Sequence, residues 1–309
     1  MKIMHSRRDA LKLSLMAGVG LAFRPFANPL NLDDKIHVRP IPSTGEELPI
    51  IGLGTWQTFD VGSSMEQRKL LSQVLMELYR FGGTVIDSSP MYGTSEKVVG
   101  DLTQNLDFKN NLFYATKVWT SGKQAGIDQM ETSLTKMHRR QMDLMQIHNL
   151  VDWRTHVKTL KLWKEQGKIR YWGLTHYVDS AHSTLESIIK AERPDFVQFN
   201  YSIRSRHAEN SLFDTAQKYK VATIINQPYE SGSLFRLVKG KELPPWAKEQ
   251  DIASWGQYFL KFILSNENVT CVIPGTSKPH HMTDNMQAGL GKIPDASIRD
   301  RMVSYLKSL

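Results

Sequence analysis

One stretch of the chain reads Gly83-Thr84-Val85-Ile86-Asp87-Ser88-Ser89-Pro90-Met91-Tyr92-Gly93-Thr94-Ser95-Glu96. Its apolar, β-branched start over residues 84–86 predicts one buried strand. The strand ends at Asp87, a Ser-Ser-Pro turn then presents Tyr92, and a helix is predicted to open behind Thr94. We therefore expect Asp87 and Tyr92 to face the mouth of one pocket.

The same unit of a short apolar strand followed by a helix recurs along the chain. After a small hairpin over residues 38–51, strands are predicted near residues 50, 84, 112, 142, 169, 196, 221 and 269. Eight such repeats close naturally into a barrel, so the sequence predicts an α/β fold, a (β/α)8 TIM barrel with an N-terminal β-hairpin. A doubly wound sheet is the alternative, because alternation alone does not fix closure. We also expect a helix over 206–219, a long loop over 226–250 and a helix over 251–265.

The composition is that of a soluble globular protein, with 40% hydrophobic and 23% charged residues in a chain of 309. The net charge is +8, and residues 1–30 supply +4 of it, with five basic residues against one acid. The remaining excess of +4 does not indicate nucleic-acid binding. The single cysteine, Cys271, excludes an internal disulfide and is predicted to be a buried strand residue. No metal site is expected.

The chain opens with Ser6-Arg7-Arg8-Asp9-Ala10-Leu11-Lys12, followed by an apolar stretch over 13–23. A basic start before a short apolar segment is typical of an export signal, and the segment is short for a membrane span. The paired arginines resemble the twin-arginine signal, which implies passage of the folded protein through the twin-arginine export machinery. We therefore divide the chain into residues 1–30, export signal and linker, and residues 31–309, the barrel. A periplasmic location is expected, or a membrane-anchored one if the signal is not cleaved.

Four chemically able side chains are predicted at one rim of the barrel. Asp87 ends the second strand, Tyr92 follows it, and Lys117 and His148 end the third and fourth strands. An ammonium lowers the pKa of a nearby phenol, so Lys117 is expected to make Tyr92 a better proton donor. Asp87 would hold Lys117, and His148 would donate to an oxygen that develops negative charge. With no paired carboxylates or activated nucleophile, the electron pair must come from a cofactor.

The chain resembles the aldo-keto reductase family over residues 36–290. The matching regions are residues 83–96, residues 130–148 and residues 272–279, the last with Asp284-Asn285 following. The resemblance implies that the four rim residues are a catalytic tetrad with Tyr92 as general acid. It also implies NADPH-dependent reduction of an aldehyde or ketone to an alcohol, with hydride from the nicotinamide.

A phosphate site is indicated where Gly275-Thr276-Ser277-Lys278 leads into a helix N-terminus, although an ordinary strand–turn–helix connection has the same pattern. The resemblance implies that this site holds the adenosine 2′-phosphate, with Asp284 and Asn285 facing the adenine. His281 stands where the family commonly has an arginine. The other cofactor contacts that the resemblance implies are Gly54, Thr55, Asp87, Thr175, His176, Gln198, Asn226, Gly232 and Leu234. Among these, Thr175, His176 and Gln198 match the positions that hold the nicotinamide carboxamide.

The substrate side is predicted to include Trp56 and Trp119 as an aromatic wall beside Tyr92 and His148, or else these tryptophans pack at the rim. Because a helix rather than a long loop ends the chain at Leu309, we expect an open pocket. A monomer is also expected. The alternative function is an exported cofactor-binding sensor or a chaperone-like barrel with little turnover. Altered cofactor residues such as His176, Asn226 and His281 favour it, and the complete tetrad favours the enzyme.

Overall fold

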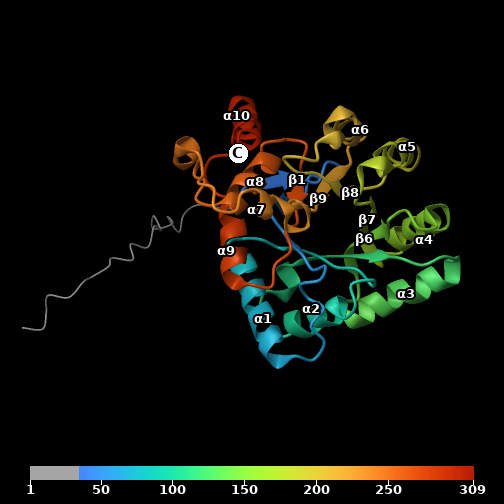
Figure 1. The fold of residues 1–309 in the computed structure, drawn as a ribbon. Coiled ribbons are helices and arrows are strands. Elements are labelled where there is room, and N and C mark those ends of the chain that lie inside the picture. Colours follow the sequence, from blue (N-terminus) through green and yellow to red (C-terminus); the bar gives the residue numbers. More distant parts are fainter. Residues whose placement is uncertain (1–34) are drawn as a thin grey trace, which may run out of the picture. The chain divides into compact units, whose positions relative to one another are not determined.

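The computed structural model describes residues 35–309, and the predicted export signal lies outside this part of the chain (Figure 1). A hairpin comes first, formed by β1 (Val38–Pro40) and β2 (Glu47–Pro49). Eight parallel strands follow: β3 (Leu53–Gly54), β4 (Val85–Asp87), β5 (Phe113–Val118), β6 (Met142–His148), β7 (Ile169–Thr175), β8 (Phe196–Asn200), β9 (Ala222–Asn226) and β10 (Cys271–Val272).

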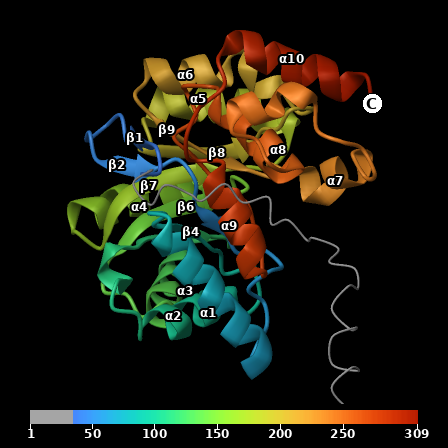
Figure 2. The same ribbon diagram turned by 90° about the vertical axis from the view of Figure 1, so that its left-hand side faces the viewer.

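Helices alternate with these strands and follow one another around the outside of the sheet (Figures 1 and 2). They are α1 (Met65–Arg80), α2 (Ser95–Thr103), α3 (Lys123–Lys136), α4 (Trp153–Glu165), α5 (His182–Glu192), α6 (Leu212–Lys218), α7 (Ser233–Leu237), α8 (Trp255–Leu264), α9 (Pro279–Gln287) and α10 (Ala296–Lys307). Short 3-10 turns lie at Lys109–Asn111, Asp179–Ala181, His207–Asn210, Glu230–Gly232 and Pro245–Gln250.

The sheet has the order of a barrel. Each strand from β3 to β10 pairs in parallel with the next strand along the chain. Two further parallel bridges, Ile51 to Val272 and Gly54 to Gly275, join the first strand to the last. A doubly wound sheet reverses its strand order part-way, and this sheet does not. The predicted (β/α)8 barrel and the N-terminal hairpin are therefore confirmed.

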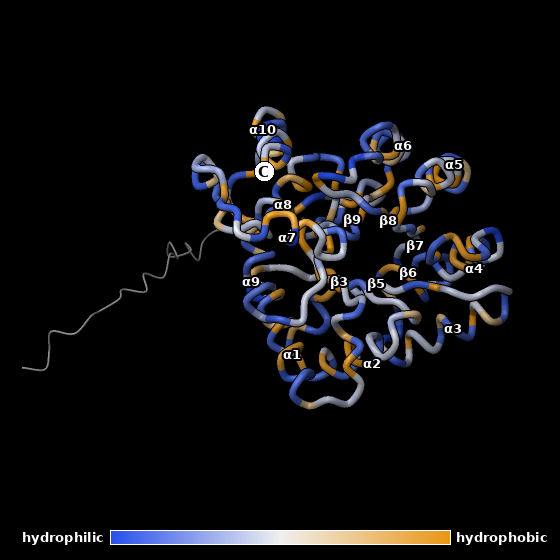
Figure 3. Tube along the Cα trace, viewed as in Figure 1, coloured by the Kyte–Doolittle hydropathy of each residue, from blue (hydrophilic) through white to orange (hydrophobic). Residues whose placement is uncertain are grey.

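The core has two parts because successive side chains of a strand point to opposite faces. An outer layer packs the strands against helix faces, such as the one that presents Leu71, Val74 and Leu78 of α1. Figure 3 shows the matching alternation of hydrophobic and hydrophilic segments along α4 and α5. An inner cluster fills the barrel with side chains from its strands, and Ile41 and Leu48 of the hairpin region join it. The hairpin therefore seals the barrel interior at the end away from the carboxyl ends of the strands.

The segment after β9 corrects the sequence prediction. The expected loop over 226–250 contains α7 and two 3-10 turns, and the expected helix over 251–265 begins only at Trp255. Ser254 sets this start by accepting a hydrogen bond from the Gln257 amide. The α7 helix is stabilised by tertiary packing, since Phe235 lies against Phe259 of α8 with ring centroids 5.8 Å apart. Such packing has no local sequence signal.

The helix predicted over 206–219 is also wrong in part. Residues 207–210 form a 3-10 turn, and α6 begins at Leu212 after the non-helical backbone of Ser211, φ −165° and ψ −22°. Cys271 is buried in β10, as predicted. Within residues 35–309, no helix combines the length and the apolar character needed to cross a bilayer.

Candidate active site

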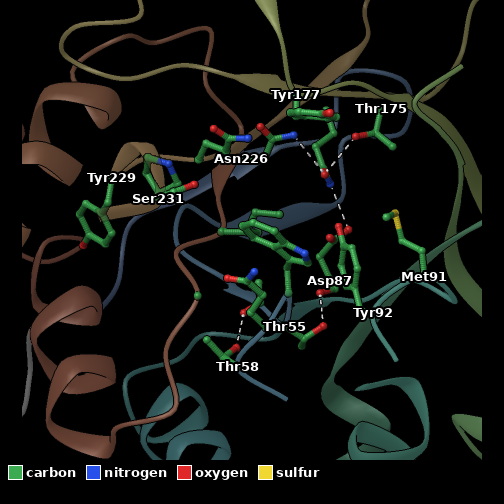
Figure 4. Close-up of a pocket in the computed structure, with 18 of the residues that line it drawn as sticks. Thr55, Thr58, Asp87, Met91, Tyr92, Thr175, Tyr177, Asn226, Tyr229 and Ser231 are labelled. Atoms are coloured by element: carbon green, nitrogen blue, oxygen red, sulfur yellow. Dashed lines mark hydrogen bonds between the residues drawn. The ribbon is translucent and has the colours of Figure 1, made fainter. Parts of the chain in front are cut away.

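The barrel brings the four predicted rim residues together. Asp87 is the last residue of β4, Lys117 lies one residue before the end of β5, and His148 is the last residue of β6. Tyr92 lies between β4 and α2, in a turn closed by a hydrogen bond from its amide to the Ser89 carbonyl. Figure 4 shows Asp87 and Tyr92 beside each other on one wall of the cavity.

Lys117 and Asp87 form a buried ion pair. The Lys117 ammonium, which is fully buried, donates to Asp87 Oδ2 at 2.5 Å and to the Ser88 carbonyl at 2.7 Å. Burial alone would lower the pKa of Lys117, but the Asp87 carboxylate and Tyr92 more than offset it, so the pKa is raised. The ammonium is therefore charged throughout the physiological range.

The second oxygen of Asp87 accepts two more hydrogen bonds. Gln146 Nε2 lies 2.9 Å and Gln198 Nε2 3.0 Å from Asp87 Oδ1. Together with Lys117, these amides occupy both carboxylate oxygens and fix the side chain. The sequence analysis missed Gln146, although it precedes His148 by two residues on β6 and so points to the same inner face.

The pKa of Tyr92 is raised in the structure, whereas the sequence analysis predicted that Lys117 would lower it. Burial raises the pKa of the phenol, and this outweighs Lys117, whose charge acts in the expected lowering direction. The Lys117 ammonium lies 5.0 Å from the centre of the Tyr92 ring. The burial that reverses the direction of the shift appears only in the folded structure. Tyr92 therefore holds its proton at neutral pH, as a proton donor must.

His148 is held as a neutral imidazole. Its ring meets the Tyr92 ring edge-on at 5.7 Å between centroids, and Nδ1 lies 2.8 Å from Ser89 Oγ. Burial, followed by the charges of Lys117 and His176, lowers the pKa of His148 to about 2. A neutral imidazole keeps one N–H, which is enough to donate one hydrogen bond.

The site opens into a cavity of about 570 Å³ at the carboxyl ends of the strands. Asp87, Tyr92 and His148 line it, and Thr175 of β7 and Asn226 of β9 line it as well (Figure 4). Residues 227–229, 231, 232 and 235, which follow β9, line a further part. No described residue after Gly275 lines this cavity.

Amides and hydroxyls from β7, β8 and β9 continue the lining beyond Asp87 and His148, since Thr175 pairs with His148 in the sheet and Gln198 donates to Asp87. Thr175 Oγ1 donates to Gln198 Oε1 at 3.1 Å, and Asn226 Nδ2 donates to the His176 carbonyl at 3.1 Å. Asn226 Oδ1 is buried and has no hydrogen-bond partner within residues 35–309. His176 Nδ1 accepts from the Tyr177 amide, and the His176 side chain does not line the cavity. Thr175, Gln198 and Asn226 do line it.

Gly54 and Thr55 line the cavity at the end of β3. Thr55 Oγ1 donates to the Asp87 carbonyl at 3.0 Å, so this residue also supports the strand end that carries the ion pair. Gly232 lines the cavity with a left-handed backbone, φ 83°, while Leu234 is buried in α7 and does not line it.

Of the residues predicted for the phosphate and the adenine, Gly275 lines this cavity and the others, from Thr276 onward, do not. Lys278 is exposed just before α9, and Thr276 Oγ1 accepts from the Lys278 amide at 3.1 Å. Asp284 accepts from Ser254 and Gln257, and Asn285 Oδ1 accepts from the Tyr229 hydroxyl at 2.7 Å. The structure thus gives both predicted adenine residues partners within the protein. Ser277 and His281 follow the same strand end, with His281 against His280.

The two predicted tryptophans differ in their places. Trp56 lines the cavity and is 46% exposed. Trp119 is 42% exposed and lies beside His148, with 6.5 Å between ring centroids, but it does not line the cavity. Met91 and Tyr177, which the sequence analysis did not single out, add exposed apolar surface at the cavity mouth.

Comparison with known proteins identifies the family, since a model described as Aldo/keto reductase family matches residues 50–301. This chain belongs to the aldo/keto reductase family. Methylglyoxal reductase YeaE of Escherichia coli (strain K12) is 27% identical over 246 residues, which cover 77% of this chain and 84% of that protein. The NADH-specific methylglyoxal reductase of the same organism is 25% identical over 256 residues, or 72% of this chain and 77% of that protein.

Solved structures of the family share the fold. An aldo-keto reductase from Klebsiella pneumoniae in complex with NADPH superposes with a TM-score of 0.74 at 22% identity, covering 88% of this chain and 95% of that one. A second Klebsiella pneumoniae structure, with NADP and acetate, gives a TM-score of 0.72 at 24% identity over 84% of this chain and 93% of that one. The nicotinamide cofactor predicted from the sequence is confirmed as that of the family.

The cavity of this aldo/keto reductase fits such a cofactor. A carboxamide presents both a donor and an acceptor, and the orphaned acceptor Asn226 Oδ1 needs a donor. Thr175 and Gln198 lie next to it on the same wall. These three residues would hold the carboxamide. His176 would contribute only through its backbone carbonyl, which accepts the hydrogen bond that orients Asn226.

Gly93 follows Tyr92 directly, and its backbone conformation and its close approach to Asp60 both favour a glycine. Its φ is 60°, and a Cβ there would collide with the Asp60 carboxylate, which itself accepts from the Thr94 amide. We expect Gly93→Ala to cost about 2 kcal/mol of folding free energy and to lower kcat about tenfold by shifting Tyr92. Gly45→Ala is the control, because Gly45 also has a positive φ but an added Cβ meets nothing within 4 Å. Equal kcat losses in the two variants would contradict the assignment.

The neutral His148 makes the stability of the reductase depend on pH. Its pKa falls from an ordinary 6.5 to about 2 on folding, so below pH 6.5 the unfolded chain binds a proton that the folded protein does not. The contribution of His148 is therefore complete above its unfolded pKa and is lost as the pH falls toward 2. We expect it to remove about 1.4 kcal/mol per pH unit from the unfolding free energy below about pH 6.

Urea unfolding at a series of pH values measures this effect. In His148→Gln, the unfolding free energy is expected to depend less steeply on pH than in the wild type, because one proton fewer is taken up on unfolding. His176 and His182 also have lowered pKa values through burial and remain in both proteins, so they cancel in the comparison. Identical slopes would show that His148 is not held neutral.

Proposed function

We propose that this aldo/keto reductase reduces an aldehyde or ketone to an alcohol with NADPH, and that Tyr92 supplies the proton. The arrangement that supports this most strongly is a half-buried Tyr92 whose ring lies beside both the Lys117–Asp87 ion pair and His148. The pKa of Tyr92 is raised and that of Lys117 is raised, while that of His148 is lowered. When bound, the reduced nicotinamide supplies a hydride to the carbonyl carbon.

The residues of this chain bind the carbonyl oxygen and supply its proton. The carbonyl oxygen lies between the Tyr92 hydroxyl and the imidazole N–H of His148, which stabilise the negative charge as it develops. Tyr92 then gives its proton to that oxygen, and the Lys117 ammonium stabilises the phenolate that is left. Asp87 keeps Lys117 charged and in place, and Gln146 and Gln198 keep Asp87 in place.

The cavity favours an uncharged substrate. None of its lining residues, all within residues 35–309, is a lysine or an arginine, and Asp87 already has its partners. Trp56, Met91 and Tyr177 give its mouth an apolar surface. A carboxylate or phosphate on the substrate would enter without a cationic partner, which is unfavourable. We therefore propose small uncharged aldehydes and ketones, with methylglyoxal as the first to test.

The preference for NADPH rests on the segment before α9. The exposed Lys278, with Thr276 and Ser277, offers one cation and two hydroxyls to a phosphate at a helix N-terminus. The NADPH-bound structure of the Klebsiella pneumoniae reductase supports this choice. The NADH-specific relative makes the comparison of both cofactors necessary.

The test follows the consumption of reduced cofactor by the purified full chain. NADPH and NADH are each offered with methylglyoxal and with glyoxylate, which carries a carboxylate. We expect turnover of methylglyoxal with NADPH, and a kcat/KM for glyoxylate lower by about tenfold or more. Tight binding of NADPH without turnover of any uncharged carbonyl would overturn the reductase and favour the sensor.

We also propose that residues 1–30 export the folded protein to the periplasm through a twin-arginine-type signal. The support is the Arg7-Arg8 pair before a short apolar stretch. Replacing both arginines with lysine is expected to leave the full chain in the cytoplasm, because the charge is kept but the paired guanidinium groups are lost. Cell fractionation measures this, and equal export of both forms would contradict it.

A further inference from the structure

Ser89 links the two groups that face the carbonyl oxygen in the proposed reaction. Its backbone carbonyl accepts from the Tyr92 amide at 3.0 Å and so closes the turn that presents Tyr92. Its side-chain oxygen lies 2.8 Å from His148 Nδ1 and accepts from the Met91 amide at 3.3 Å. Ser89 is fully buried, so no bulk water competes for these contacts.

The direction of the Ser89–His148 hydrogen bond follows from counting protons. A serine hydroxyl has one proton to donate, and Ser89 Oγ already accepts from the Met91 amide. His148 Nδ1 is the one acceptor within hydrogen-bond distance of this hydroxyl among residues 35–309. If Nδ1 carried the imidazole proton, the buried hydroxyl would have no acceptor, which is costly.

We propose that Ser89 is a positioning residue that holds His148 as the Nε2–H tautomer. Ser89 donates to Nδ1, so the single proton of the neutral ring sits on Nε2, the nitrogen left to face the cavity that His148 lines. The assignment deepens the proposed function and rests on it for its kinetic consequence. It concerns a residue outside the four predicted from the sequence.

The consequence is that His148 carries its proton on Nε2, ready to donate a hydrogen bond, before a substrate binds. Without the serine hydroxyl, the neutral imidazole is free to place its proton on either nitrogen, and only one form can donate to the carbonyl oxygen. The burial of the ring and the charge of Lys117 keep it from being protonated on both nitrogens. Ser89 therefore selects the productive form of a ring that cannot become doubly protonated.

The first test is the nitrogen NMR spectrum of His148 in the full chain without substrate. The signals are assigned by their loss in His148→Gln among the ten histidines of the sequence. We expect a protonated Nε2 and an unprotonated Nδ1 in the wild type, and shifts averaged between the two tautomers in Ser89→Ala. A protonated Nδ1 in the wild type, or unchanged shifts in Ser89→Ala, would overturn the proposal.

The second test separates positioning from a loss of structure. Ser89→Ala is expected to lower kcat for carbonyl reduction about tenfold with little change in KM, the effect of losing one buried hydrogen bond. Ser133→Ala is the control, since it also removes a fully buried serine hydroxyl but one that donates within α3 at 3.1 Å to the Gln129 carbonyl. Equal kcat in the wild type and Ser89→Ala would overturn the positioning role.

The NMR result keeps the two proposals apart. A wild type with Nε2–H on His148 but no reduction of any carbonyl would refute the proposed reaction and leave the tautomer assignment standing. A working reductase with Nδ1–H on His148 would refute the assignment and leave the reaction standing.

Discussion

Tyr92→Phe is expected to lower kcat for NADPH-dependent carbonyl reduction by about 10³-fold, within the range that a positioned proton donor contributes. The change removes one oxygen atom and keeps the ring that lies 5.7 Å from the His148 ring and 5.0 Å from the Lys117 ammonium. Cofactor binding is expected to be unchanged, because the Tyr92 ring stays in place and Tyr92 is not among the residues assigned to the carboxamide. Single-turnover kinetics and a separate titration of NADPH binding measure the two effects.

Tyr305→Phe is the matched control for this substitution. The Tyr305 hydroxyl donates to the Glu242 carbonyl at 3.0 Å, and the residue does not line the active-site cavity. It is expected to leave kcat at the wild-type value. If Tyr92→Phe retained more than about a tenth of wild-type kcat, a group other than Tyr92 would have to deliver the proton.

Lys117→Met is expected to have the largest effect on stability, a loss of about 3–5 kcal/mol, because it leaves the Asp87 carboxylate buried without its cation. Asp87 is 2% exposed, and only the Gln146 and Gln198 amides would then stabilise its charge. Urea unfolding at neutral pH measures the loss. Carbonyl reduction is expected to fall by about 10² or more, since the phenolate of Tyr92 loses its stabilising ammonium.

A double-mutant cycle isolates the ion pair. Asp87→Asn with Lys117→Met removes both charges, so the double variant is expected to be less destabilised than the sum of the single variants. The shared neighbours Gln146 and Gln198 remain in all four proteins. Additive losses within about 0.5 kcal/mol would mean that the pair contributes no coupling to the fold.

The fold was predictable because its signals are local and repeated. Each strand is a short apolar run, and eight such runs with helices between them are the pattern of a (β/α)8 barrel. The hairpin was predictable from its polar turn. The α7 helix was not, since Phe235 is ordered by its contact with Phe259, a residue of a helix further along the chain.

That the side chains of the candidate site meet at one rim of the barrel was predictable from the sequence, but their protonation states were not. Strand ends placed Asp87, Lys117 and His148 at one rim, yet the raised pKa of Tyr92 results from burial, which appears only in the folded structure. The roles of Ser89 and Gln146 likewise depend on contacts between strands, to His148 and to Asp87. The predicted adenine residues have contacts that no sequence motif indicated. The Asn285 side chain, for example, accepts a hydrogen bond from the Tyr229 hydroxyl.

One isotope measurement tests the central claim most directly. The full chain is given methylglyoxal and NADPH that carries deuterium in both hydrogen positions at C4 of its nicotinamide, and the product is analysed by mass spectrometry. The account predicts one deuterium on the carbinol carbon of the alcohol, at a rate that Tyr92→Phe nearly abolishes. Oxidation of NADPH without deuterium in the alcohol, or the same rate in Tyr92→Phe, would contradict it.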